Sequence, residues 1–462
     1  MLALGVSLGD KSLATELPDQ TEQLALSIRE ALVCEQRHDW IGAAAGYAKA
    51  SQLDPQDARL VTNLAHALWL ADLPHPAEKC YRRAIKMDSC SGTAWCGLAN
   101  TLRDLNRFEE AAEAYAQATG SEAAWCLSQV MLGMEHYSEG FRLAENRKSL
   151  NFFNFYWPQP FWDQRRFHTL DPREDLWVWS EQGFGDTFQY LRWIPLLIET
   201  RHQQAIALGA PYPAELYLVV ESNLVSLFRE GLAWMSRPPH VLCKSKPAGP
   251  VPKNHGPMMS LPHFLGMVPD PHDSGPILRS PLWNPGGPSL FSCDLDDKSH
   301  RVGIVWASGR YLDKPYSHRE YLKRSLPPGE LWGLIEGLQS GGAQLVSLQY
   351  GEDTELASLL GFSLAKPLLD LGTFSAVARV LAQLDLIITV DTAMAHLAGS
   401  MGMPGWILLP WSADSRWLRD RSDSPWYPSL RLFRQPRTGD WHEVIDQVLM
   451  AYGELFSAAP GC

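Results

Sequence analysis

The chain has 462 residues, 45% hydrophobic and 20% charged, so it is long enough for about three domains and apolar enough to bury their cores. Its formal net charge of -12 argues against a general binder of nucleic acids or of anionic membranes, because both need a concentrated basic surface. The cysteines are scattered and form no C-x-x-C pair, which predicts a reduced, cytoplasmic protein without structural zinc. The first residues lack a basic segment, so no signal peptide is expected. No apolar run reaches about 18 residues, so no membrane span is expected.

A 34-residue repeat dominates the first part of the chain. Small and aromatic residues recur at this period in two helices, namely at Ala43, Ala77 and Ala111, at Tyr47, Tyr81 and Tyr115, at Ala50, Ala84 and Ala118, at Ala31, Ala65 and Ala99, and at Leu68 and Leu102. The A-x3-Y-x2-A spacing places them on one helix face, and a helix-turn-helix unit of this length is typical of the tetratricopeptide repeat. An amphipathic bundle with accidental self-similarity is the alternative.

The repeats predict a stacked α-solenoid over residues 1–150, with three clear copies near residues 27–121. A single copy cannot bury its apolar face alone, so the copies stack and expose a concave groove that suits an extended peptide or a partner protein. A degenerate helix pair over residues 123–147 is expected to cap the stack. Residues 151–167 are rich in aromatics, Pro and Gln, and mark the crossover into the next domain.

The rest of the chain is predicted to form two Rossmann-like α/β domains, over residues 151–290 and 291–462. Short strand-like runs alternate with helical stretches, which favours mostly parallel sheets. The predicted strands cover residues 176–179, 216–220, 301–306, 344–348, 385–390 and 406–409. Ligands of such sheets bind beyond the carboxyl ends of the strands, so two facing domains predict a cleft at these ends.

The first segment that could carry chemistry follows the strand at residues 176–179. Gly183 and Gly185 form a glycine-rich turn that lets a ligand approach the backbone, and a helix is expected from Thr187. Asp186 lies at the start of that helix. The residues alone leave two interpretations of Asp186 open: an N-capping aspartate, which they favour slightly, or a functional carboxylate.

The second segment opens a helix directly after the strand at residues 385–390. Free amides at this helix start, near Thr392 and Ala393, favour a phosphate. Asp391 would repel a phosphate, so we expect it to cap the helix or to accept hydrogen bonds from sugar hydroxyls. His396 lies one turn after Thr392 on the same face, where a structural role is as common as a functional one.

The third segment is a basic stretch in the loop after the strand at residues 301–306. Its polar side chains are Arg310, Lys314, Arg319, Lys323, Arg324 and Ser325. Cations at this position could neutralise a diphosphate leaving group, although most of a basic stretch usually faces solvent; we select Arg324 and Ser325. The sequence Asp294-Leu295-Asp296 imitates the D-x-D of metal-dependent sugar transferases, but it precedes the strand inside a linker, so no metal site is expected.

Five segments in order resemble the bacterial family of tetratricopeptide proteins with a C-terminal glycosyltransferase domain. They are WSEQGFGD at residues 179–186, GIVWA at 303–307, VSLQ at 346–349, VDTAMAHLAG at 390–399 and SPWYP at 424–428. That domain is similar to the lipopolysaccharide heptosyltransferases, and the layout is similar to that of the O-linked N-acetylglucosamine transferases of proteins. The resemblance covers nearly the whole chain.

The resemblance implies a GT-B fold, with the acceptor half first and the nucleotide-sugar half second, working without a metal or another cofactor. It implies that Asp186 is the general base and that Gln349 contacts the nucleotide. The residues that it places along the donor pyrophosphate are Asp391, Thr392, Ala393 and His396, together with Arg324 or Lys323 beside Ser325. The family has Asn-Arg-Ser where this chain has Lys323-Arg324-Ser325, so the exact basic contact differs.

The predicted function is the transfer of a sugar from a nucleotide-sugar donor to a hydroxyl of a protein or a saccharide, with inversion at the anomeric carbon. The repeats would recruit the acceptor or a partner protein. The alternative is a tetratricopeptide scaffold whose transferase half is inactive and only binds a nucleotide or a partner.

Overall fold

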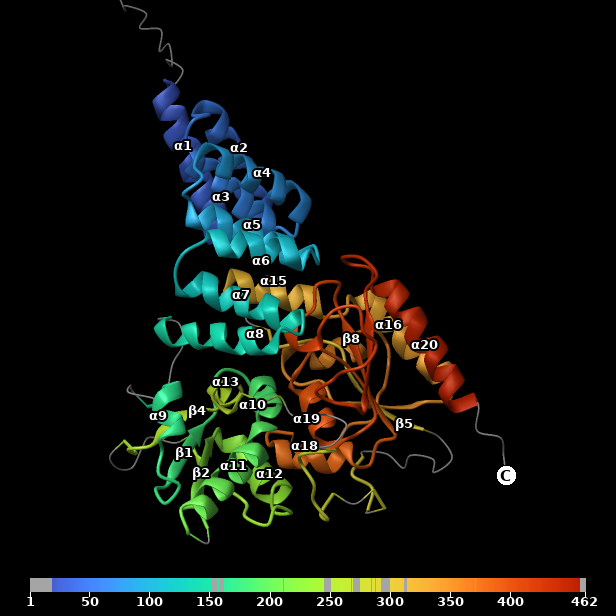
Figure 1. The fold of residues 1–462 in the computed structure, drawn as a ribbon. Coiled ribbons are helices and arrows are strands. Elements are labelled where there is room, and N and C mark those ends of the chain that lie inside the picture. Colours follow the sequence, from blue (N-terminus) through green and yellow to red (C-terminus); the bar gives the residue numbers. More distant parts are fainter. Residues whose placement is uncertain are drawn as a thin grey trace, which may run out of the picture. The chain divides into compact units, whose positions relative to one another are not determined.

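The computed structural model describes residues 19–150, 156–157, 162–210, 212–244, 251–266, 268, 275–283, 285–286, 288–291, 300–310, 314–369 and 371–457 (Figure 1). The Asp294–Asp296 motif and the first ten residues lie outside the described residues. The chain divides into two compact units, Met1–Thr101 and Leu102–Cys462, which are described separately below.

The first unit consists of paired helices with the predicted period. They are α1 (Gln20–Gln36), α2 (Trp40–Leu53), α3 (Ala58–Leu70), α4 (Pro74–Met87) and the greater part of α5 (Gly92–Asp104). The residue two positions before α2, α4 and α6 (Phe108–Gln117) has a left-handed backbone in each repeat, at His38, Asp72 and Asn106, with φ of 57°, 58° and 58°. His, Asp and Asn tolerate this conformation better than most residues. The repeated turn confirms the 34-residue period.

Small residues make the helix contacts of the repeats. Ala31, Ala43, Ala65, Ala77 and Ala99 have no exposed surface, so neighbouring helices can approach closely. Ala118 departs from the predicted pattern, because α6 ends at Gln117 and Ala118 follows it in an extended conformation.

The second unit begins inside α5, and so includes the last helices of the predicted solenoid. These are α6, α7 (Ser121–Gly133), α8 (Tyr137–Ala144) and the 3-10 helix η1 (Glu145–Ser149). The degenerate pair predicted over residues 123–147 is therefore helical. By its contacts this segment belongs with the α/β region, whereas the sequence pattern groups residues 1–150 together.

The first sheet has the strand order β3-β2-β1-β4, and every pairing in it is parallel. In the described residues its strands are β1 (Leu176–Trp179), β2 (Leu216–Val220), β3 (His240–Cys243) and β4 (His255–Pro257). The accompanying helices are α9 (Gln164–His168), α10 (Phe184–Tyr190), α11 (Trp193–Ala207), α12 (Ser222–Gly231) and α13 (Leu261–Leu265), with η2 (Met258–Ser260). The sequence pattern predicted β1 and β2 but missed β3 and β4.

The second sheet has the order β6-β5-β7-β8-β9 and is also parallel. Its strands in the described residues are β5 (Arg301–Val305), β6 (Gln344–Ser347), β7 (Leu386–Val390), β8 (Gly405–Leu409) and β9 (Leu430–Arg434). The helices are α15 (Pro315–Arg324), α16 (Pro328–Ser340), α17 (Leu356–Leu359), α18 (Phe374–Leu381), α19 (Ala393–Met401) and α20 (Trp441–Ser457), with η3 (Glu352–Glu355) and η4 (Ser415–Trp417). Of these strands, the sequence pattern missed β9.

A continuous apolar core joins the two α/β halves. It contains Phe188 and Trp193 from the first half and Trp417 and Tyr427 from the second, all fully or almost fully buried. Helix α10 packs on α19, and α12 packs on α18, which lies beside it in Figure 1. Side chains that follow β1 and β7 are thereby brought together.

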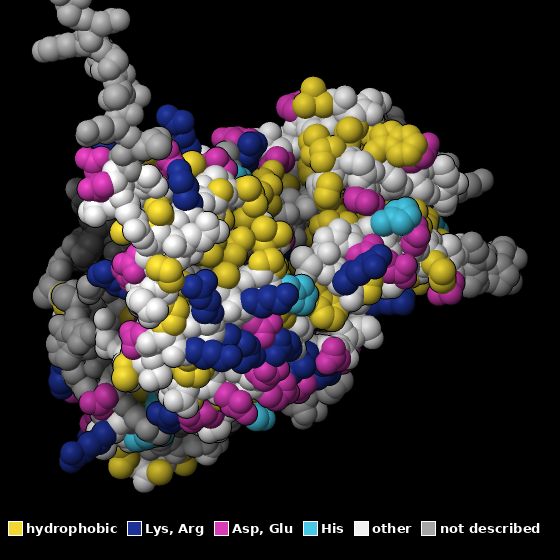
Figure 2. All heavy atoms as spheres, turned by 90° about the horizontal axis from the view of Figure 1, so that it is seen from above, with side chains coloured by type: hydrophobic (Ala, Val, Ile, Leu, Met, Phe, Trp, Pro, Cys, Tyr) yellow, Lys and Arg dark blue, Asp and Glu magenta, His cyan; other side chains and the backbone are white. Residues whose placement is uncertain are grey.

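The acidic and basic side chains are mixed on the surface that Figure 2 shows. Lys and Arg lie among Asp and Glu on that face. In the part of the chain that the structure describes, no helix is long and apolar enough to span a membrane.

Candidate functional site

The predicted glycine-rich turn is shorter than the sequence suggested. Helix α10 begins at Phe184, three residues before the predicted start, so Gly183 is its N-cap and Gly185 lies in its first turn. Asp186 is the third helical residue rather than the N-cap. Its Oδ2 accepts a hydrogen bond of 3.1 Å from the Gly183 amide, which satisfies a free donor at the helix start.

The other oxygen of Asp186 meets an arginine from the second half. Arg416, in η4 after β8, donates from Nη2 to Asp186 Oδ1 at 2.9 Å. The Arg416 Nε also donates to Asp414 Oδ1 at 2.8 Å. One guanidinium therefore joins a carboxylate after β1 to a carboxylate after β8. Sequence reasoning missed Arg416 and Asp414; their position just beyond a predicted strand was the available signal.

His396 completes this group from the first turn of α19. Its Nε2 lies 3.4 Å from Arg416 Nη1, and its Nδ1 lies 2.9 Å from Tyr427 Oη. A guanidinium can only donate, so Nε2 must carry the lone pair, and the proton is on Nδ1, which donates to the tyrosine oxygen. Burial and the nearby Arg416 hold the pKa of His396 well below its usual range. His396 is thus a neutral side chain of fixed tautomer.

Gly185 allows α10 to approach the histidine this closely. A side chain at this position would place its Cβ 2.8 Å from His396 Cδ2 and 3.3 Å from Arg416 Nη1. Both neighbours are held by hydrogen bonds, so neither ring nor guanidinium is free to yield. Here the glycine serves the contact between the two halves, whereas the sequence predicted an approach to a ligand.

The residues predicted beside the donor pyrophosphate lie at the carboxyl end of β7 and at the end of α15. Thr392 is the N-cap of α19 and accepts from the Met394 amide at 3.2 Å, so it caps the helix in place of Asp391. Ala393 is the first residue of that helix. Asp391 instead faces Arg324, with Nη1 and Oδ2 3.6 Å apart.

The basic stretch is largely helical, which corrects its placement in a loop. Pro315 opens α15 and the cations Lys323 and Arg324 close it, an arrangement that suits the helix dipole. Ser325 caps the end of α15, and its Oγ accepts from the Ser308 amide at 3.1 Å. Lys323 lies 3.4 Å from Ser412 Oγ.

Gln349 is occupied by the protein's own backbone. Its Oε1 accepts from the amides of Trp306 and Ala307 at 3.0 Å and 2.9 Å, and its Nε2 donates to the Ala307 and Tyr350 carbonyls. These bonds fix the carboxyl end of β5 beside that of β6. In this arrangement Gln349 shapes the edge of the sheet, and contact with a nucleotide stays a prediction.

Burial and the neighbouring arginines shift the pKa values of Asp186 and Asp414 in opposite directions. Burial raises the pKa of Asp186 above its ordinary range, although Arg416 opposes the shift. Arg416 and Arg324 together lower the pKa of Asp414, despite its burial. Among the described carboxylates of this cluster whose pKa is shifted, Asp186 is therefore the most basic, and it is paired with the guanidinium of Arg416.

A buried ion pair fixes the turn that carries Asp186. Arg147, in η1, donates to both carboxylate oxygens of Glu181, at 2.6 Å from Nη2 and 3.1 Å from Nε. It also reaches Glu145 and Ser260, at 2.8 Å and 3.0 Å. Arg147 has no exposed surface, and Glu181 is 3% exposed. The helical segment before the first sheet is thus bonded to the strand end from which α10 starts.

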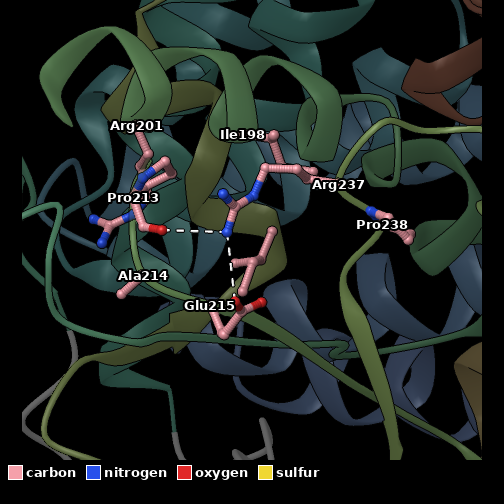
Figure 3. A pocket seen from close by; sticks show the side chains of 8 residues that line it. Ile198, Arg201, Pro213, Ala214, Glu215, Arg237 and Pro238 are labelled. Carbon is pink, nitrogen blue, oxygen red and sulfur yellow. Dashed lines mark hydrogen bonds and ion pairs between the residues drawn. The ribbon is translucent and has the colours of Figure 1, made fainter. Parts of the chain in front are cut away.

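A pocket lies at the amino end of strand β2 in the first sheet, opposite the carboxyl ends of the strands (Figure 3). Glu215 in its wall directly precedes β2, so the pocket lies at the amino end of the strand. Arg237 donates there to the Pro213 carbonyl at 3.3 Å and to Glu215 at 3.4 Å. The Arg201 guanidinium donates to the carbonyls of Asp171 and Glu174. The charged side chains of the pocket are therefore bonded to the protein itself. The pocket lies at the amino end of β2, whereas the predicted ligand site lies at the carboxyl ends of the strands.

Among the described residues, no group of three or more His, Cys, Asp or Glu side chains is arranged to hold a metal ion.

Comparison with known proteins identifies the helical region. The tetratricopeptide repeat family matches residues 92–124. The chain carries tetratricopeptide repeats. Solved structures similar to these repeats include pilF of Pseudomonas aeruginosa, with 24% identity, a TM-score of 0.27 and coverage of 29% of this chain and 64% of that chain. The first tetratricopeptide domain of Spaghetti (RPAP3), solved with an HSP90 peptide, has 19% identity, a TM-score of 0.24 and coverage of 24% and 96%.

A curated relative extends over more of the sequence. Protein FlbA of Caulobacter vibrioides is 25% identical over 376 residues, which is 75% of this chain and 59% of FlbA. The chain therefore spans about three fifths of the length of this relative. The name of FlbA states no chemical activity.

Proposed function

We propose that the α/β region is a GT-B glycosyltransferase that moves a sugar from a nucleotide-sugar donor to a hydroxyl of a protein or saccharide acceptor. The observation that carries this proposal is the convergence of Asp186 from the first half with Arg416, His396 and α19 from the second. A carboxylate that is 13% exposed and paired with a guanidinium, on a helix that packs on α19, is an arrangement that suits transfer from a diphosphate.

In the proposed reaction, Asp186 accepts the proton of the acceptor hydroxyl while the acceptor oxygen bonds to the anomeric carbon. The bond from that carbon to the donor phosphate breaks, and its electron pair leaves on the nucleoside diphosphate. Arg324, Arg416 and the positive end of the α19 dipole stabilise the growing negative charge. A single displacement from the opposite face inverts the anomeric centre. The side chains of this chain supply each step without a metal.

The repeats suggest how the acceptor would arrive. Stacked tetratricopeptide helices present a concave surface, and the RPAP3 domain named above was solved with a peptide. We propose that the repeats recruit a protein, either as the acceptor or as a partner.

The first test is thermal unfolding with a panel of nucleoside diphosphates and nucleotide sugars, with magnesium and with a chelator. A ligand at a hundred times its Kd stabilises the folded state by about 2.7 kcal/mol. A selective rise in Tm that does not depend on magnesium supports a donor site. If every common nucleotide sugar leaves Tm unchanged, the alternative function, a scaffold with an inactive transferase half, is favoured.

Arg324→Ala is expected to weaken donor binding by about 10- to 100-fold, because one charge-assisted hydrogen bond to phosphate contributes about 1.5–3 kcal/mol. Arg324 already lies against Asp391 at the carboxyl end of β7. Isothermal titration with the nucleotide sugar found in the panel measures the effect. Arg437→Ala, which removes an 83% exposed cation from the same half, is the matched control. Equal Kd values for the two variants would remove Arg324 from the donor site.

A further inference from the structure

Asp104, the last residue of α5, is a buried carboxylate of the helical segment that receives bonds from two parts of the second α/β half. Its side chain is 4% exposed. Arg319 of α15 lies 2.8 Å from Oδ2, and Ser412, after β8, donates from Oγ to Oδ1 at 3.2 Å. Lys323 of α15 lies 3.7 Å from the same Oδ1. One carboxylate therefore ties α15 to the loop after β8.

Both tied elements lead directly to the candidate site. Helix α15 ends at Arg324, the neighbour of Lys323, and the loop after β8 reaches Asp414 and Arg416 within four residues of Ser412. Arg324 faces Asp391, and Arg416 faces Asp186. A displacement of either element would move a cation away from the place where the proposed reaction develops charge.

Further bonds from the same helical segment hold the loop. Asn106 Nδ2 donates to the Trp411 carbonyl at 2.8 Å, and Ser415 Oγ donates to Gln129 at 3.0 Å. Arg419, which follows η4, pairs with Glu109 at 3.0 Å. Loops that are bonded along their length to a rigid helix pair keep the geometry of the residues they carry. Asp104 differs from these other contacts because it reaches both elements and is buried.

We infer that Asp104 is a positioning residue for the donor site: from the repeat helices, it holds Arg324 and Arg416 in place through α15 and the loop after β8. This inference rests on the proposed transferase function. The inference assigns a role in that site to Asp104, a residue of the helical segment that lies outside the α/β halves.

The test compares full-length Asp104→Asn with Ser412→Ala and with the control Glu110→Gln. Asp104→Asn keeps the shape of the side chain but loses the charge that Arg319 and Lys323 need. Ser412→Ala loosens only the loop after β8, and stays informative if the first variant does not fold. Glu110 lies in α6 and forms an exposed ion pair with Arg107, the N-cap of that helix. This ion pair includes no residue of α15 or of the loop after β8.

Two measurements separate the inference from the proposed function. Hydrogen exchange of the amides in residues 410–423 should become faster in both variants. The nucleotide probes are the diphosphates of uridine, guanosine and adenosine. For the nucleotide that binds the wild type, the Kd should rise about tenfold or more in both variants. In transfer assays the donor KM should rise while the acceptor KM stays unchanged. Glu110→Gln should match the wild type throughout.

Wild-type Kd values for both variants would overturn the positioning role of Asp104, and so would unchanged exchange in residues 410–423. If the wild type binds no nucleotide, the proposed function fails. In that case the exchange data still decide whether Asp104 holds the loop.

Discussion

Asp186→Asn should lower the rate of sugar transfer by about 10²- to 10⁴-fold while leaving the Kd of the nucleotide sugar near the wild-type value. General-base catalysis contributes a factor of this size, and an amide cannot take the proton of the acceptor hydroxyl. The amide keeps an oxygen that can accept from the Gly183 amide or from Arg416, so the local structure should persist. Single-turnover assays with the donor identified by thermal unfolding measure the transfer step.

The pH dependence of kcat/KM gives this prediction a second readout. Transfer needs the ionised carboxylate, so the rate should fall as the pH falls through the pKa of Asp186, which burial places above the ordinary value of 3.8. The groups that set this pKa are Arg416, which lowers it, and Asp414, which raises it. Burial and the nearby Arg416 lower the pKa of His396 from its ordinary value.

Asp171→Asn is the matched control for these experiments. Asp171 lies before β1, at the other end of the strand from the site, and pairs with the exposed Arg173. It should leave both the rate and the acid limb unchanged. Undiminished transfer in Asp186→Asn would show that another group takes the proton.

Arg147→Met is expected to cost about 3–5 kcal/mol of folding stability, because it leaves the carboxylate of Glu181 buried without its charge partner. Arg147 makes two hydrogen bonds to Glu181, of 2.6 Å and 3.1 Å, and has no exposed surface. The free energy of unfolding of Leu102–Cys462, followed by urea denaturation with tryptophan fluorescence, measures the loss. Several tryptophans of this unit are fully buried, so their emission reports its core.

Two further variants test the cause of this loss. Arg142→Met breaks an exposed pair with Glu139, whose side chains are 55% and 48% exposed, and should cost less than about 1 kcal/mol. Arg147→Met combined with Glu181→Leu should recover much of the stability, because it removes the stranded charge as well. A loss in Arg147→Met no larger than in Arg142→Met would mean that the buried pair contributes little.

The repeats and the sheets were predictable from the sequence to different degrees. The period of Ala43, Ala77 and Ala111 recurs in the structure because each alanine sits at the same helix contact. Strands β1, β2, β5, β6, β7 and β8 are runs of buried apolar residues and were predicted. Strand β4 has only three residues and includes Pro257, so it offers no pattern. Strand β9 was missed because two arginines, Arg431 and Arg434, interrupt its apolar residues.

The candidate site was predictable in part. Asp186, Thr392 and His396 were found because each follows a strand in a recognisable motif. Arg416 was missed because it lies in a polar segment without periodicity, and its partners Asp186 and His396 are distant in sequence. Its role follows only from the packing of α10 on α19, which no local pattern encodes.

The boundary of the compact units at Thr101 has a consequence for how such proteins can diverge. The bonds of Asp104 and Arg147 fall after the boundary, so a change in the helices before α5 removes none of the residues that make them. If the repeats recruit a protein as proposed, recombination ahead of α5 alters the recruiting surface and leaves these bonds in the sequence unchanged. Under the proposed function, the choice of partner and the transfer chemistry would then be inherited as separate traits.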